Sequence, residues 1–172
     1  MGKPEFKPAP NFVSLKSFAE TAAPTSENGP EAQLFSLKTP LLEQGRLTNH
    51  VAKTALMKVS VKVYASGGEN AMHMHPFEDH AFVVLEGQAT FRIGAEENIK
   101  VLNKHDGVML PRGTLYCFLS SAEENLVMLR MGAAEKWPEN WRTTPDGRPS
   151  EGNSLENKDV EQVILPGQFF GG

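Results

Sequence analysis

The sequence predicts an all-β domain, an antiparallel sandwich or barrel with extensions at both ends. Short apolar runs recur about every 8–12 residues from residue 57 onward, separated by turn-forming Gly, Pro, Asn and Asp. Prolines interrupt the first forty residues so often that no long helix can form there. The 172 residues amount to about one domain, which is long enough to bury its own core.

The expected strands follow one another along the chain. Met57–Tyr64 alternates apolar and polar side chains, which is typical of a half-buried strand. Ala81–Leu85 is a continuous apolar run, and a bulge near Gly87 decides which side chains after it face inward. Ala89–Ile93 alternates again. Further short strands are expected at 99–102, 108–110, 115–119 and 126–131, with a last one at 160–165, while 34–37 is either an edge strand or a short helix.

Several side chains are expected to line the interior. They are Phe118, Phe82, Phe91 or Val84, and either Met72 or Met74. Such residues would make a small, mostly apolar pocket around a polar centre, which suits a modest organic substrate and not a polymer.

Composition excludes several classes of partner. Seventeen basic and 21 acidic side chains give a net charge of −4, so the chain has no excess of positive charge to attract nucleic acid or an anionic membrane. Cys117, the single cysteine, has no partner for a disulfide. The start of the chain lacks the apolar core of a secretion signal, and no apolar run approaches the ~20 residues of a membrane helix. We therefore expect a cytoplasmic protein that binds neither nucleic acid nor membrane.

Three of the five histidines fall within residues 73–80. His73 and His75 are two residues apart, so on a strand both imidazoles project to the same face. His80 follows after enough chain for a turn and a return into the next strand. Converging neutral imidazoles suit Fe(II), Zn(II), Mn(II), Ni(II) or Cu(II). We predict one divalent transition metal at His73, His75 and His80; the alternative is exposed or hydrogen-bonded histidines without a metal.

Two stretches resemble the motifs of a known family. Gly67-x5-His73-x-His75-x4-His80-x6-Gly87 is similar to the first cupin motif, and Asp106-x4-Pro111-x-Gly113-x2-Tyr116 to the second. The resemblance implies a double-stranded β-helix, a small jelly-roll barrel with the metal near its centre. It divides the chain into an N-terminal arm (1–45), a barrel (46–132) and a tail (133–172) that packs on the barrel or on a partner subunit.

The chain departs from the cupin pattern at two ligand positions. His80 stands where the first motif has a glutamate, so Glu78 and Asp79 are interpreted as solvated turn acids or as partners that orient an imidazole. Tyr116 stands where the second motif usually has a histidine. A neutral tyrosine, with a reference pKa of about 10, is a poor ligand. Tyr116 is therefore expected to be either a catalytic acid/base beside the metal or a wall of the cavity.

The resemblance leaves three functions open. Several three-histidine cupins are Fe(II) dioxygenases, which implies that activity on a small chelating substrate such as a diketone, a hydroxyketone or a thiol acid. The first alternative is a non-redox isomerase, cyclase or lyase in which Tyr116 moves a proton, and the second is a small-molecule-binding protein without catalysis. Cupins are commonly dimers through exchanged extensions, so we expect a homodimer.

The remaining polar and aromatic candidates are given structural roles. His105 is expected in an exposed turn, His50 has no assigned role, and Cys117 should be a buried small residue on the opposite face of its strand from Tyr116. Arg92 and Arg112 are interpreted as solvated, although either could clamp a carboxylate. Trp137 and Trp141 should pin the tail to the barrel or to a partner.

Overall fold

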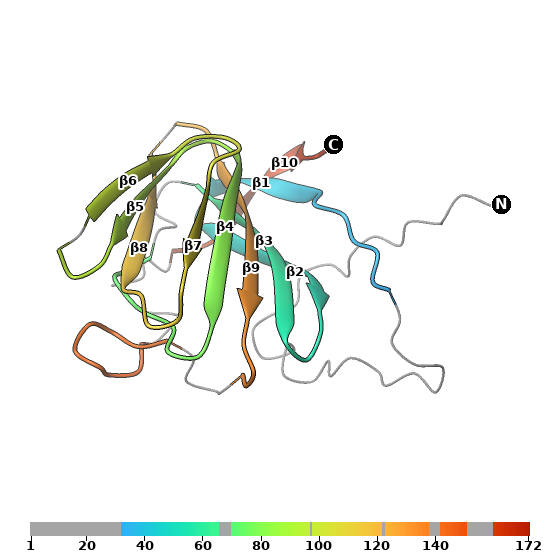
Figure 1. Ribbon diagram of the computed structural model, residues 1–172. Helices are drawn as coiled ribbons and strands as arrows, with labels where there is room; N and C mark the ends of the chain where they lie inside the picture. Colours follow the sequence, from blue (N-terminus) through green and yellow to red (C-terminus); the bar gives the residue numbers. More distant parts are fainter. Residues whose placement is uncertain (1–31, 66–69, 97, 122, 138–141, 151–159) are drawn as a thin grey trace.

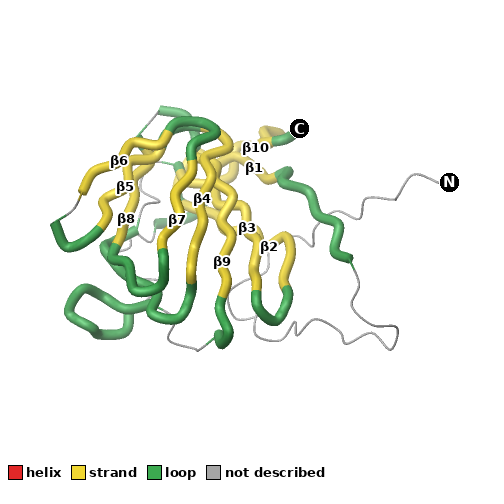
Figure 2. The backbone as a smooth tube through the Cα atoms, in the orientation of Figure 1, coloured by secondary structure: helices red, strands yellow, loops and turns green. Residues whose placement is uncertain are grey.

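Strands and loops make up the described part of the chain. The computed structural model describes residues 32–65, 70–96, 98–121, 123–137, 142–150 and 160–172. No helix occurs in these segments (Figure 2). Their strands are β1 (Thr39–Gln44), β2 (Arg46–Lys53), β3 (Met57–Tyr64), β4 (Asp79–Glu86), β5 (Ala89–Ile93), β6 (Asn98–Leu102), β7 (Gly107–Leu110), β8 (Tyr116–Ser120), β9 (Leu126–Ala133) and β10 (Val163–Phe170). The all-β prediction is confirmed.

Two antiparallel sheets enclose the main core (Figure 1). The larger has the strand order β2-β3-β9-β4-β7 and the smaller the order β6-β5-β8. Phe82 from the larger sheet meets Phe91 and Phe118 from the smaller one, with ring centroids 5.6 and 5.8 Å away. Phe91 and Phe118 lie 5.1 Å apart. All three are buried, together with Val84, so the prediction that they face inward is confirmed.

A bulge in β4 sets the orientation of the side chains beyond it. The pairing of β4 with β9 shifts between Val84 and Glu86, close to the bulge expected near Gly87. Gly87 itself has φ of 76°, and a Cβ there would lie 2.7 Å from the carbonyl oxygen of Asn125. Only glycine satisfies both conditions, because other residues are strained at such φ values and would also clash with the backbone.

The third sheet pairs the two ends of the described chain. β1 and β10 form an antiparallel pair, and Leu42 and Phe170 pack with Val61, Val63 and other residues on the face of the larger sheet that points away from the main core. β1 from the arm and β10 from the tail thus cover a face of the larger sheet. The domain boundaries at 45 and 132 stay predictions.

Sequence periodicity missed two strands and misjudged two segments. β2 was not anticipated, because it carries polar residues and has only one fully buried position, Leu47. β1 was not anticipated because Pro40 lies within it. Residues 34–37 are neither strand nor helix, and the last strand is Val163–Phe170 instead of 160–165. No described helix is long and apolar enough to span a membrane.

Candidate metal centre

His73 and His75 lie in the connection between β3 and β4. The sequence predicted a strand here, but the segment forms only isolated bridges: the backbones of His73 and Tyr116 exchange two hydrogen bonds of 3.0 and 2.9 Å, and Met74 pairs with Thr143. Both imidazoles are nevertheless buried. The short extended segment therefore achieves what the predicted strand was expected to do, which is to direct both rings inward.

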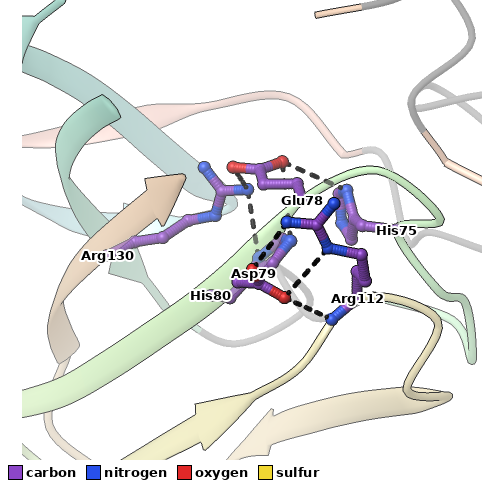
Figure 3. Close-up of polar contacts among 6 residues, drawn as sticks. All are labelled: His75, Glu78, Asp79, His80, Arg112 and Arg130. Carbon is purple, nitrogen blue, oxygen red and sulfur yellow. Dashed lines mark hydrogen bonds and ion pairs between the residues drawn. The ribbon is translucent and has the colours of Figure 1, made fainter. Parts of the chain in front are cut away.

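Glu78 and His80 complete a buried cluster with His75 (Figure 3). Glu78 Oε2 lies 3.5 Å from His75 Nδ1 and 3.5 Å from His80 Nε2. One donor atom from each residue can be chosen so that all lie within 4.8 Å of one another. The interpretation of Glu78 as a solvated turn acid is wrong, because its side chain is only 3% exposed. Its position between two imidazoles matches the other interpretation, a carboxylate that orients them.

Arg130 on β9 holds this cluster from the side of the larger sheet. Its Nη2 donates to Glu78 Oε1 at 2.7 Å and to His80 Nδ1 at 3.1 Å. A guanidinium has no acceptor, so His80 Nδ1 accepts and the ring hydrogen of neutral His80 lies on Nε2. Gly132 lies two residues after Arg130 on the same strand, and a Cβ at Gly132 would lie 1.8 Å from Glu78 Oε1. The Glu78 carboxylate thus occupies the space that a side chain at position 132 would fill.

His73 lies beside this cluster. Its Nδ1 is 2.7 Å from the carbonyl oxygen of Ala71, so Nδ1 donates and Nε2 carries the free lone pair. Its ring centroid is 5.1 Å from that of His75. The compact donor group is His75, Glu78 and His80, with His73 adjacent to it and outside the 4.8 Å limit. Metal binding by His73, His75 and His80 stays a prediction, and Glu78 is a further candidate.

The residues present fit a divalent transition metal. His73 Nε2, His80 Nε2 and Glu78 Oε2 are buried atoms without a hydrogen-bond partner among the described residues. Buried polar atoms are almost always hydrogen-bonded, and exceptions that lie close together are compatible with a bound ion. Imidazole nitrogen and carboxylate oxygen are both ligands of first-row transition metals.

Burial keeps the three imidazoles neutral. It is the largest cause that lowers the pKa of His73, His75 and His80 below the usual value. The next cause is Arg142 for His73, His80 for His75, and Arg130 for His80. Neutral imidazole is the form that binds metals, so the site is ready for a metal near neutral pH.

Tyr116 faces the histidines from β8. Its ring centroid lies 4.6 Å from that of His73, 6.1 Å from His75 and 6.0 Å from His80. Burial raises the pKa of the phenol, so Tyr116 stays protonated at neutral pH. The structure thus places Tyr116 at the cluster, where it forms a wall and could also donate a proton.

Other candidates from the sequence lie away from the cluster. His105 has φ of 75° in a turn. Arg112 donates to Asp79 in an exposed ion pair of 2.9 Å. Cys117 is buried but does not belong to the aromatic core around Tyr116. Trp137 donates to the carbonyl oxygen of Ala55 and so pins the start of the tail, and Trp141 lies outside the described residues.

Sequence reasoning missed the basic side chains of the interior. Arg130 is buried in the middle of β9, where the sequence Leu-Val-Met-Leu-Arg-Met would lead one to expect an apolar residue, and this break was the available signal. Lys62 donates to Tyr64 Oη at 2.9 Å, and Arg142 is buried as well. For Arg142, which follows the last predicted barrel strand, the sequence offers no comparable signal.

Comparison with known proteins identifies the fold. No protein-family model matches the chain, and no curated protein matches it. An uncharacterized conserved protein with a double-stranded β-helix domain from Klebsiella pneumoniae has a similar solved structure, with a TM-score of 0.54 and 21% identity over 62% of this chain and 93% of that chain. This chain folds as a double-stranded β-helix.

Two further structures are similar to this double-stranded β-helix. A conserved protein of unknown function from Streptococcus pyogenes has a TM-score of 0.50 and 18% identity, over 64% of this chain and 94% of that one. A cupin superfamily protein from Desulfitobacterium hafniense has a TM-score of 0.48 and 18% identity, over 54% and 80%. The similarity to the Klebsiella pneumoniae protein supports the double-stranded β-helix that the sequence motifs led us to expect. At such identities a structural similarity shows the fold, and function has to be argued from the site.

Proposed function

We propose that this double-stranded β-helix is a metal-dependent enzyme, an Fe(II) dioxygenase that acts on a small chelating organic substrate. The supporting observation is the buried donor set of two imidazoles and one carboxylate, His75, His80 and Glu78, with donor atoms within 4.8 Å. Two histidines and one carboxylate that leave metal positions open are typical of non-haem Fe(II) oxygenases. His73, predicted as a ligand from the sequence, would add a nitrogen from the adjacent loop. Zn(II), Mn(II), Ni(II) and Cu(II) are the alternative metals.

The protein's own residues would bind and orient the substrate. Fe(II), when bound, supplies the redox chemistry with dioxygen, which no side chain here can supply. Arg130 and Arg142 act electrostatically on the imidazoles and favour an anion near them. A deprotonated diketone, hydroxyketone or thiol acid offers both the negative charge and two donor atoms. The aromatic core next to Tyr116 would exclude water from the reaction.

Anaerobic reconstitution tests this proposal. The apoprotein is loaded with Fe(II) and oxygen uptake is measured with diketones, hydroxyketones and thiol acids. We expect uptake with at least one class, and its loss in Glu78→Ala and His75→Ala. If no substrate class gives oxygen uptake and the protein retains Zn(II) tightly, the proposed dioxygenase activity would be contradicted, whereas the proposed metal site would still be supported.

A non-redox metalloenzyme is the second candidate, and Tyr116 supports it. A buried, protonated phenol next to the imidazoles is placed to donate a proton to a substrate bound there. Such an enzyme would turn over with Zn(II) in the absence of oxygen, and Tyr116→Phe would lower its kcat by about 10²-fold or more. Tyr64→Phe, which removes the other phenol of the chain, is the matched control. A metal-loaded protein that binds a small molecule without turnover would indicate the third function, binding alone.

We also propose that the protein is a cytoplasmic homodimer. The β1–β10 sheet supports an association, because Ile164 and Phe169 are 40% and 47% exposed there. Sedimentation equilibrium at micromolar concentration measures the mass. A monomer of 18.9 kDa would contradict the dimer.

A further inference from the structure

Arg130 already holds two of the groups that a metal would use. Its Nη2 bridges Glu78 Oε1 at 2.7 Å and His80 Nδ1 at 3.1 Å (Figure 3). The guanidinium, the carboxylate and the imidazole are all buried, at 7%, 3% and 1% exposure of their side chains. A charge-assisted contact in such surroundings is strong, because water does not compete for it.

A metal bound to His80 would conflict with this contact. With Arg130 donating to Nδ1, neutral His80 carries its ring hydrogen on Nε2, the nitrogen that faces Glu78 Oε2. If a metal bound Nε2, the hydrogen would move to Nδ1 and would then face the Arg130 N–H group. Two donors cannot share a hydrogen bond, so Arg130 has to leave His80 when the metal arrives.

Charge adds to the conflict. Arg130 is a buried guanidinium in direct contact with His80 and Glu78. A divalent cation bound to His80 would be repelled by this positive charge. An anion that enters beside this guanidinium would reduce the repulsion, and its oxygens would offer Arg130 a new partner in place of His80 and Glu78.

We propose that Arg130 couples metal binding to the binding of a carboxylate anion. Without an anion, the guanidinium stays on Glu78 and His80 and weakens metal binding. With an anion, Arg130 turns to its carboxylate, and Glu78 and His80 become available to the metal. Arg130 is therefore a positioning residue, and the metal and the anion bind cooperatively. The inference rests on the proposed function and extends it by naming the residue that recognises the anion and couples its binding to that of the metal.

Calorimetric titration of the full-length apoprotein with Mn(II) tests the coupling. The titration is run at equal ionic strength in sodium perchlorate and in sodium acetate, a monocarboxylate that does not chelate, with free Mn(II) corrected for its weak acetate complex. We expect acetate to lower the Kd for Mn(II) at least about fivefold, and Mn(II) to tighten acetate binding by the same factor. Equal Mn(II) affinities in the two salts would overturn the proposal and leave the metal site standing. Absence of Mn(II) binding in both salts would contradict the proposed function itself, and with it the coupling.

Variants assign the coupling to Arg130. Arg130→Met removes the charge and the donors, so Mn(II) should bind at least about fivefold more tightly than to wild type without acetate, and the acetate effect should fall below about twofold. Arg112→Met is the matched control, because it removes an arginine whose ion pair with Asp79 is exposed. This variant should behave as wild type. Undiminished acetate coupling in Arg130→Met would overturn the assignment. If that variant does not fold, Arg130→Lys retains the charge without the planar donor group and should show weaker coupling than wild type.

Discussion

Replacing Gly132 by alanine tests the architecture of the proposed metal centre with a single methyl group. The added Cβ would lie 1.8 Å from Glu78 Oε1 and 2.9 Å from its Cδ, whereas ordinary contacts begin at 3.4 Å. The carboxylate oxygen therefore has to move by about 1.6 Å, the difference between 3.4 and 1.8 Å. Arg130 Nη1 would lie 3.4 Å from the new methyl group, which is an ordinary contact, so the displacement falls on the Glu78 carboxylate.

The expected cost follows from the buried ion pair. Moving Glu78 by that distance breaks its 2.7 Å contact with Arg130. Breaking a buried pair costs about 3–5 kcal/mol, and the gain from replacing glycine in a strand returns only about 0.5–1 kcal/mol. We expect Gly132→Ala to lower the free energy of unfolding by about 2–4 kcal/mol in urea titrations. Metal affinity should fall about 10- to 100-fold, because a ligand or its orienting carboxylate is displaced.

A double-mutant cycle isolates the cause. In a Glu78→Ala background the space beside residue 132 is empty, so adding Gly132→Ala should cost less than about 1 kcal/mol. Metal affinity, already reduced by Glu78→Ala, should not fall further. If Gly132→Ala in the otherwise wild-type protein retained both stability and metal affinity, the carboxylate would not occupy this position, and the site built on it would be wrong.

Three further predictions concern the scaffold. Gly87→Ala should cost at least about 2 kcal/mol more than Gly94→Ala, because both have positive φ but only Gly87 has a carbonyl oxygen 2.7 Å from the new Cβ; equal losses in urea titrations would contradict the clash. Asn125→Ala should cost about 2 kcal/mol and speed amide exchange in β1, because both hydrogen bonds to Leu42 are lost; unchanged β1 protection would refute this role. Burial lowers the pKa of His50 to about 3, so the unfolded state binds a proton that the folded state does not between pH about 6.5 and 3. Stability should therefore fall by about 1.4 kcal/mol per pH unit from this group as the pH drops through that window, and an equally steep slope in His50→Gln would contradict it.

Local patterns carried most of the fold prediction. The alternation in Met57–Tyr64 matched β3 to the residue, and the inward direction of Phe82 and Phe118 was also predicted correctly. Phe91 and Val84, which were given as alternatives, are both buried. These strands are half-buried, so the alternation of apolar and polar side chains along them indicates which face meets the core. β2 was missed because the alternation of apolar and polar residues is weak in a strand that has polar side chains and only one fully buried residue.

The site was only partly predictable, because its members come from segments far apart in the chain. His75 and His80 are close in sequence, and their spacing was enough to find them. The contact of Glu78 with Arg130 spans 52 residues and depends on the pairing of β4 with β9. No local pattern contains that information, so the sequence could not decide whether Glu78 is a solvated turn acid or a partner that orients an imidazole.

The register of β9 assembles the centre. His80 pairs with Gly132 and Phe82 with Arg130 across β4, while Ser60 pairs with Arg130 across β3. Residues two apart on a strand share a face, so β9 presents to the interior both the guanidinium of Arg130 and, two residues further along, Gly132, which has no side chain. The first neutralises Glu78 and the second makes room for it. A slip of one residue would turn both toward the outer face and would place Met131 among the histidines. The proposed metal centre therefore depends on strand pairing as much as on its candidate ligands, and a change that shifts β9 should abolish metal binding even if every histidine is kept.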